Sequence, residues 1–135
     1  MNRRMLDTQN LIHAADQARQ KAYAPYSGFR VGAALLCRDG TVFTGCNIEN
    51  ASYPVSNCAE RTALFTAVSE GYREFEALAV VSDSGDFTPP CGVCRQALSE
   101  FCGSDFIILM CSGSLSYRQT TLGTLLPFAF SLQLM

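Results

Sequence analysis

The sequence has a single histidine, no run of lysine or arginine, and no apolar stretch long enough to span a bilayer. The histidine, His13, lies in a predicted helix away from every motif described below, so we do not expect it to bind a metal. A protein that holds a nucleic-acid polymer needs a basic stripe that displaces counterions from phosphates. The formal net charge of −2 instead favours a small uncharged substrate. We therefore expect neither a nucleic-acid partner nor a membrane partner.

Signals for export and for disulfide stabilisation are also missing. Arg3 and Arg4 are not followed by the apolar segment of a secretory signal. Seven cysteines are an odd number, which favours reduced thiols in the cytoplasm, some of them bound to a metal. A chain of 135 residues can bury a core without disulfides, so we expect residues 1–135 to form a single domain.

Hydrophobic periodicity and turn residues predict the order α-β-β-α-β-α-β, followed by a weaker C-terminal signal. Thr8 is a candidate cap for the first helix, and the helices are expected at 8–23, 58–70 and 92–101. The strands are expected at 31–37, 41–46, 75–82 and 106–111. Asp39 and Gly40 mark a hairpin turn between the first two strands. Beyond them, 112–121 is a polar loop or edge strand, and 122–126 is a candidate short helix. This order favours a mixed sheet covered by helices.

Two short motifs contain the residues best suited to chemistry: Cys58-Ala59-Glu60 and Pro90-Cys91-Gly92-Val93-Cys94. Three thiols with no obvious fourth donor suit a catalytic zinc site, which keeps one position open for water. Cys58 and Cys91 begin predicted helices, where free amides and the helix dipole lower thiol pKa values. Glu60 can handle the protons of that water only if Cys58 lies in the first helical turn, because residues two apart otherwise point to different faces.

The charge of such a site leads to a second prediction. Zinc with three thiolates carries a net charge of −1, which makes the metal a poorer Lewis acid than one held by histidines. Arg61 and Arg95 each follow one of the motifs. We expect at least one of them, with Arg61 favoured, to donate hydrogen bonds to the thiolates and withdraw charge from them.

Two alternatives of other classes remain open at this point. A zinc-stabilised binding module without catalysis predicts a closed site, with Cys46 or Cys102 as the fourth sulfur, and gives Glu60 no role. A redox protein would use Cys91 and Cys94 as its dithiol pair and would hold no stoichiometric zinc.

The two motifs together match the signature of zinc-dependent base deaminases. The chain further resembles the small homotetrameric cytidine deaminases of pyrimidine salvage. The segments that carry this resemblance are Tyr26–Ala34, Gly45–Tyr53, Cys58–Arg61, Pro90–Gln96 and, more weakly, Leu125–Phe130.

The resemblance implies a three-layer α-β-α fold of the α/β class with a mixed five-stranded sheet, one zinc ion per subunit, and a homotetramer with shared active sites. It implies hydrolytic deamination of cytidine and 2′-deoxycytidine to uridine and 2′-deoxyuridine with release of ammonia. Zinc-bound hydroxide would attack C4 of the base, with Glu60 as the proton shuttle. A deaminase of another aminopyrimidine nucleoside, such as blasticidin S, is the alternative within this class.

The resemblance also assigns residues to these roles. The zinc ligands would be Cys58, Cys91 and Cys94. Asn47 and Glu49 would hold the ribose 3′-hydroxyl, and Phe29 would pack on the pyrimidine ring. The backbone of Ala59 and the side chain of Glu60 would contact the base edge. Phe130 would reach into the site of a neighbouring subunit. Phe128 departs from the pattern, because the family has a small residue at its position.

Overall fold

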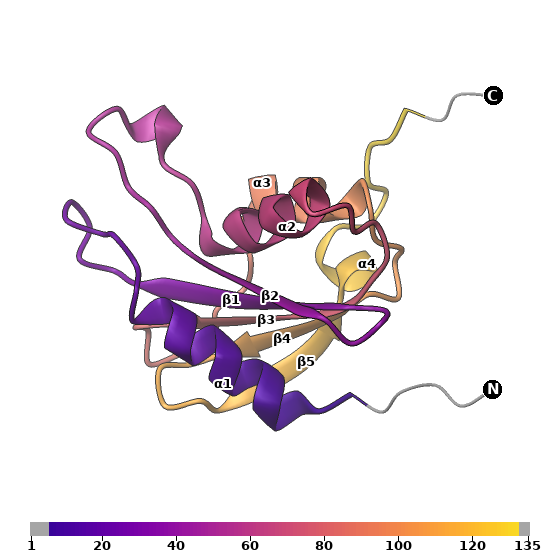
Figure 1. The fold of residues 1–135 in the computed structure, drawn as a ribbon, viewed down its shortest axis with the longest axis horizontal. Helices are drawn as coiled ribbons and strands as arrows, with labels where there is room; N and C mark the ends of the chain where they lie inside the picture. Colours follow the sequence, from indigo (N-terminus) through magenta and orange to yellow (C-terminus); the bar gives the residue numbers. More distant parts are fainter. Residues whose placement is uncertain (1–5, 133–135) are drawn as a thin grey trace.

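A computed structural model describes residues 6–132 and shows an α/β fold built on one sheet (Figure 1). The strands are β1 (Val31–Cys37), β2 (Val42–Cys46), β3 (Phe75–Ser82), β4 (Ile107–Cys111) and β5 (Tyr117–Thr121). Their order across the sheet is β2-β1-β3-β4-β5, with β3 and β4 parallel and the other neighbours antiparallel. The predicted mixed five-stranded sheet is confirmed.

Helices cover both faces of the sheet (Figure 1). One face carries α1 (Thr8–Arg19), whereas the other carries α2 (Ala59–Ser69), α3 (Gly92–Ser99) and the short α4 (Leu122–Leu125). Successive side chains of β1 face opposite helix layers. Leu36 belongs to the same apolar cluster as Leu11 of α1, whereas Leu35 belongs to the cluster that contains Leu64 of α2. Among the described residues, no helix is both long and apolar enough to cross a membrane.

The start and the end of α1 differ from the prediction. The N-cap is Asp7 rather than Thr8, because the Asp7 carboxylate accepts the N–H of Asn10 at 3.1 Å. The helix ends at Arg19 instead of continuing to Tyr23. The backbone of Tyr23 is paired with the segment after β2, since its N–H donates to the carbonyl of Asn47 at 3.0 Å. The Tyr23 N–H therefore makes a hydrogen bond to a distant segment in place of one within the helix.

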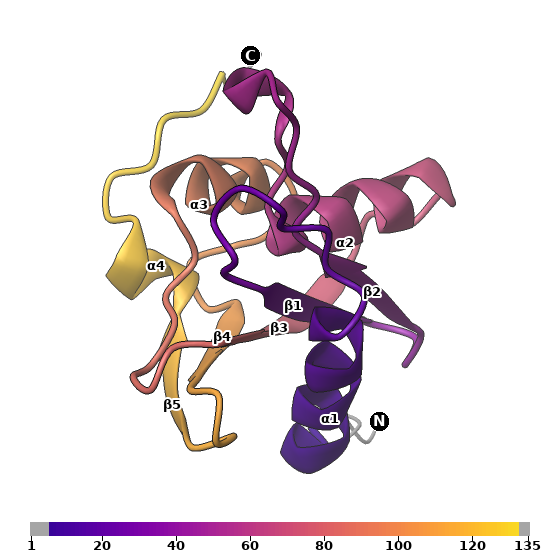
Figure 2. The same ribbon diagram turned by 90° about the vertical axis from the view of Figure 1, so that its left-hand side faces the viewer.

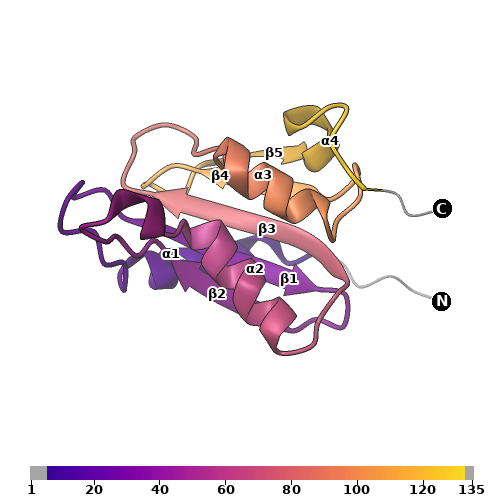
Figure 3. The same cartoon turned by 90° about the horizontal axis from the view of Figure 1, so that it is seen from above.

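One end of the sheet gathers the segments that hold the sequence motifs. There the start of β1 lies between the ends of β2 and β3, with Val31 opposite Ser82 and Gly32 opposite Cys46. The loops 20–30 and 47–57 extend from this end, at the left of Figure 1 and toward the viewer in Figure 2. The loop 47–57 contains a short 3₁₀ helix, Tyr53–Val55. Helices α2 and α3 lie side by side above the sheet (Figure 3).

Close packing fixes α2 against the sheet. A Cβ atom on Gly45 of β2 would lie 2.5 Å from the backbone nitrogen of Ala63 and 2.6 Å from the carbonyl oxygen of Ala59. No side chain fits in that space, so glycine lets the first turn of α2 approach β2. The position of this turn matters because it carries the first motif.

Candidate active site

Three thiols from two helices meet at the end of the sheet. Cys58 is the N-cap of α2 and Cys91 is the N-cap of α3, while Cys94 lies in the first turn of α3. The Sγ atoms of Cys58 and Cys91 are 3.7 Å apart, and those of Cys91 and Cys94 are 3.4 Å apart. All three sulfurs lie within 4.8 Å of one another. The predicted convergence of two helix N-termini therefore brings the thiols into one cluster.

The donor set of this cluster fits zinc. A tetrahedral site with zinc–sulfur bonds of about 2.3 Å places neighbouring sulfurs about 3.8 Å apart, close to the separations in the cluster. The seven cysteines are free thiols, so the cluster is not a disulfide. Neither Cys46 nor Cys102 belongs to the cluster, and no closed site of four sulfurs is present among the described residues. The arrangement leaves a fourth position for a non-protein ligand.

Among the clustered thiols, Cys58 is the one whose surroundings favour ionisation. Hydrogen bonding from the Cys94 thiol and from Arg61 lowers the pKa of Cys58 to about 5, although burial opposes this shift. The same contact with Cys58, together with burial, raises the pKa of Cys94. Burial likewise raises the pKa of Cys102 and of Cys111 to about 12. One thiol of the cluster is therefore prepared to ionise and to bind a cation.

Of the two arginines that follow the motifs, Arg61 contacts a thiol. Its Nη2 atom lies 3.3 Å from Cys58 Sγ, and this hydrogen bond raises the pKa of the guanidinium. Arg95 instead donates to the carbonyl oxygens of Pro90 and Leu125, at 2.8 and 2.9 Å. Arg95 thus connects the loop before α3 to the end of α4.

Glu60 occupies the first turn of α2, immediately after the Cys58 N-cap. This is the arrangement that the motif requires if both side chains are to face one point. The Glu60 side chain is 5% exposed. Burial, assisted by the negative charge of Cys58, raises its pKa to about 7. A carboxyl group with that pKa can both accept and release a proton near neutral pH.

A cleft of about 290 Å³ opens beside the thiols and Glu60. It is lined by residues within four segments: 29–31, 47–49, 56–60 and 88–91. Four residues predicted to contact substrate line this cleft: Phe29, Asn47, Glu49 and Ala59. Phe130 does not line it. Its side chain is 69% exposed, and its carbonyl oxygen accepts a hydrogen bond from Gln96 Nε2 at 3.0 Å.

Asn47 and Glu49 are held by the loop that carries Phe29. Asn47 Oδ1 accepts the N–H of Val31 at 2.9 Å, and its Nδ2 donates to the carbonyl of Phe29 at 2.8 Å. Glu49 accepts from the hydroxyl of Ser27 and from its N–H, and these bonds lower the pKa of Glu49. Each side chain keeps one further hydrogen-bonding position. The amide nitrogen of Asn47 has a second hydrogen to donate, and the carboxylate of Glu49 has a further lone pair to accept.

Several residues that line the cleft could not be predicted from the sequence. Thr88 is the clearest case, because its hydroxyl donates to the carbonyl of Cys111 at 2.8 Å and contacts the Ser82 hydroxyl at 2.6 Å. Ser56 and Asn57 also line the cleft, just before the Cys58 motif. The only sequence signal for these residues is that they lie next to a motif.

Phe128 has a backbone conformation that explains why a small residue is expected there. Its φ is 56°, in the left-handed region where a Cβ atom costs about 1–2 kcal/mol and glycine is favoured. Its side chain is fully exposed and does not line the cleft. The departure therefore affects the backbone near the C-terminus and leaves the cleft wall unchanged.

Comparison with known proteins agrees with this geometry. The family described as "Cytidine and deoxycytidylate deaminase zinc-binding region" matches residues 5–110. A cytidine deaminase from Sporosarcina psychrophila is 51% identical over 126 residues, which cover 93% of each chain. A blasticidin-S deaminase from Bacillus cereus is 31% identical over 109 residues, covering 75% of this chain and 76% of its own.

Solved structures show the same fold. The crystal structure of a cytidine deaminase from Burkholderia pseudomallei superposes with a TM-score of 0.89 at 52% identity, covering 93% of this chain and all of the other. Because the family matches most of the sequence and two of these cytidine deaminases are 51% and 52% identical to it, the assignment does not depend on the motifs alone. The chain belongs to the cytidine and deoxycytidylate deaminase family.

Proposed function

We propose that the chain is a zinc-dependent hydrolase that converts cytidine and 2′-deoxycytidine to uridine and 2′-deoxyuridine with release of ammonia. The observation that carries this proposal is the meeting of three thiols and one buried carboxyl group at a cleft of nucleoside size. A non-catalytic zinc module would need no acidic group with a raised pKa beside the thiols.

Cys58, Cys91 and Cys94 would hold one zinc ion per chain. When bound, zinc supplies Lewis acidity that makes a water molecule nucleophilic at neutral pH. Arg61 would offset the negative charge of three thiolates through its hydrogen bond to Cys58 Sγ.

Glu60 would carry protons in two directions. It takes a proton from the attacking water and delivers it to N3 of the pyrimidine ring, which makes C4 a better electrophile. It would next accept the proton of the new hydroxyl group on C4 and transfer it to the amino group, which leaves C4 as ammonia. Water and cytidine thus yield uridine and ammonia. The support for this role is the position of Glu60 next to Cys58 and a pKa of about 7.

The remaining cleft residues would bind the nucleoside. Phe29 offers an aromatic face for the base, and the backbone of Ala59 offers polar groups to the base edge. The free amide hydrogen of Asn47 and a free lone pair of Glu49 suit the two sides of the 3′-hydroxyl group.

The charge of the cleft favours a nucleoside over a nucleotide. Among the described residues that line it there is no lysine or arginine, and Glu49 contributes a carboxylate. A 5′-phosphate in this cleft would lose water without gaining a cationic partner. Within a family whose description includes deoxycytidylate, we therefore expect cytidine and 2′-deoxycytidine to be turned over and the nucleotide to be rejected.

We further place the enzyme in pyrimidine salvage in the cytoplasm, as a homotetramer with shared sites. The free state of the seven cysteines suits a reducing compartment. Exposed Phe130 would then enter the site of a neighbouring subunit, and sedimentation of the purified protein would measure the assembly.

A substrate panel tests the proposal. The zinc-loaded protein is incubated with cytidine, 2′-deoxycytidine, deoxycytidylate and blasticidin S, and the loss of absorbance is followed. Turnover of both nucleosides with little turnover of deoxycytidylate is expected. Preferred turnover of blasticidin S would instead establish the alternative function, a deaminase of another aminopyrimidine nucleoside. The 31% identical blasticidin-S deaminase from Bacillus cereus supports testing this substrate.

A further inference from the structure

The loop segment 26–30 brings Phe29 to the cleft before β1 begins at Val31. A loop without regular pairing takes its position from the groups that bind its amides. Glu49 accepts the N–H groups of Tyr26 and Ser27, and Asn47 accepts the N–H of Val31. The N–H of Arg30, between Phe29 and Val31, is bound by neither of these side chains.

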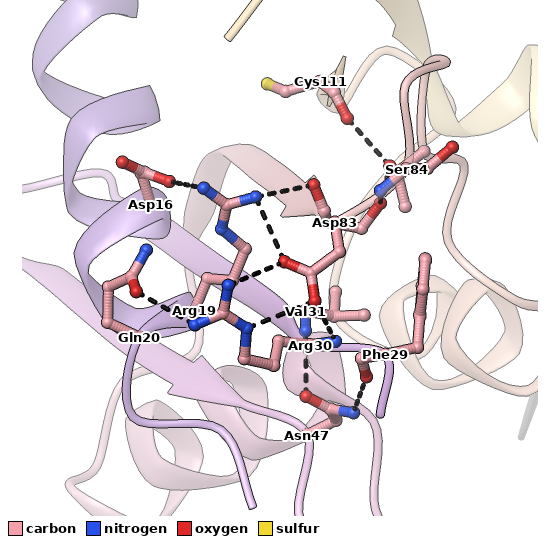
Figure 4. Close-up of polar contacts among 12 residues, drawn as sticks. Asp16, Arg19, Gln20, Phe29, Arg30, Val31, Asn47, Asp83, Ser84 and Cys111 are labelled. Atoms are coloured by element: carbon pink, nitrogen blue, oxygen red, sulfur yellow. Dashed lines mark hydrogen bonds and ion pairs between the residues drawn. The ribbon is translucent and has the colours of Figure 1, made fainter. Parts of the chain in front are cut away.

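Asp83, the residue after β3, binds both the backbone N–H and the backbone carbonyl of Arg30. Asp83 Oδ2 accepts the Arg30 N–H at 2.9 Å, and the N–H of Asp83 donates to the Arg30 carbonyl at 3.1 Å. The side chains pair as well, because Arg30 Nε lies 3.2 Å from Oδ2 and Nη2 lies 3.2 Å from Oδ1 (Figure 4). Charge-assisted bonds in this forked geometry are directional and strong.

A second arginine anchors Asp83 to the body of the protein. Arg19 of α1 approaches Asp83 Oδ1 with Nη1 at 3.4 Å, and the same nitrogen donates to the Ser82 carbonyl at 2.9 Å. Its Nη2 pairs with Asp16 of α1 at 2.6 Å, and its side chain is 11% exposed (Figure 4). The loop is therefore connected through Asp83 to α1 and to the end of β3.

The segment that Asp83 holds also fixes the orientation of the Asn47 side chain. The amide of Asn47 bridges the carbonyl of Phe29 and the N–H of Val31, which are the two neighbours of Arg30 (Figure 4). A shift of the Arg30 backbone would move both partners of this amide and the attachment point of the Phe29 ring. Asp83 itself does not line the cleft.

We propose that Asp83 is a positioning residue of the nucleoside site, which fixes the Arg30 backbone and thereby orients the Phe29 ring and the Asn47 amide. This inference rests on the proposed function, in which these two residues contact the nucleoside. Loss of Asp83 weakens substrate binding and leaves proton transfer at Glu60 unchanged, because Asp83 has no contact with the thiol cluster.

Two alanine variants separate this role from general stabilisation. Asp83→Ala and Asp16→Ala each remove one carboxylate from Arg19, and the two side chains are similarly exposed, at 25% and 27%. Of these two carboxylates, only that of Asp83 also binds Arg30. For cytidine we expect Asp83→Ala to raise KM about tenfold, with kcat changed by less than about twofold. Asp16→Ala should keep the wild-type KM.

A conservative variant and a measurement without substrate complete the test. Asp83→Asn keeps one oxygen that can accept the Arg30 N–H, so its KM should rise less than that of Asp83→Ala. If Asp83→Ala does not fold, Asp83→Asn serves as the test variant. Amide hydrogen exchange at Arg30 and Val31 should accelerate in the Asp83 variants and stay at the wild-type rate in Asp16→Ala.

The outcomes distinguish this inference from the proposed function. Equal KM values for the Asp83 and Asp16 variants, or unchanged exchange at Arg30, would overturn the positioning role. If the wild-type protein does not deaminate cytidine, the proposed function fails, and the exchange experiment still decides whether Asp83 anchors the loop.

Discussion

Replacing Gly45 with alanine tests how the first motif is held in place. The new Cβ would lie 2.5 Å from the Ala63 nitrogen and 2.6 Å from the Ala59 carbonyl oxygen, both backbone atoms of α2. Ordinary contact begins at 3.4 Å, so the start of α2 must move by about 0.9 Å. That turn carries Cys58 and Glu60, whereas Cys91 and Cys94 remain on α3.

The expected result combines a stability loss with a catalytic loss. Overpacking of this kind costs about 1–3 kcal/mol of unfolding free energy. A displacement of about 1 Å between catalytic groups lowers the rate by about 100-fold. Thermal unfolding, zinc content per chain and kcat/KM for cytidine measure these effects. Zinc should bind more weakly, because one of its three ligands has moved relative to the other two.

Gly85→Ala is the matched control. It lies in the connection between β3 and α3, and a Cβ atom there would meet nothing within 4 Å. It should keep wild-type stability, zinc content and activity. If Gly45→Ala also behaved like the wild type, the close packing of α2 on β2 could not be what positions Cys58 and Glu60.

Three further predictions follow from the charges and the backbone of the described residues. Arg61→Gln removes a hydrogen bond to Cys58 Sγ, so in zinc-free protein the pH midpoint for alkylation of Cys58 should rise, and an unchanged midpoint would contradict the role given to Arg61. The pKa of Glu60 is about 7 in the folded state, above its unfolded value of 4.5. Between pH 4.5 and pH 7 the folded protein therefore holds a proton on Glu60 that the unfolded chain has released. The contribution of Glu60 to the unfolding free energy thus falls as the pH rises through this range. In zinc-free protein, Glu60→Gln should therefore gain about 3 kcal/mol over the wild type between pH 4.5 and pH 7 by denaturant unfolding, and a constant difference would refute the shift. Phe128→Gly should raise the unfolding free energy by about 0.5–1 kcal/mol, because glycine adopts the positive φ without strain. A lower unfolding free energy would contradict this and would mean that the exposed Phe128 ring makes a stabilising contact.

The sequence predicted best those features that depend on local pattern. The strands 31–37 and 75–82 have the predicted bounds, because runs of apolar residues there are buried against both helix layers. The thiol cluster could also be anticipated, since each motif begins a helix and the spacing of Cys91 and Cys94 places both in one turn. Local spacing and helix geometry suffice for these features.

Features that depend on which loops meet could not be predicted. The end of α1 shifts because the backbone of Tyr23 pairs with Asn47, a contact between residues far apart in the sequence. Asp83 and Thr88 acquire their roles only when the end of β3 lies beside the start of β1. In the sequence both residues belong to an ordinary turn-rich segment, and nothing in their spacing distinguishes them from their neighbours.

The most direct test of the account is the turnover of cytidine by zinc-loaded wild-type protein and by its Glu60→Ala variant, with zinc measured in both samples. We expect the wild type to form uridine, and we expect Glu60→Ala to retain about one zinc per chain but to lose almost all deamination. Uridine formation by Glu60→Ala at the wild-type rate, or a wild type that binds zinc and leaves cytidine unchanged, would contradict it.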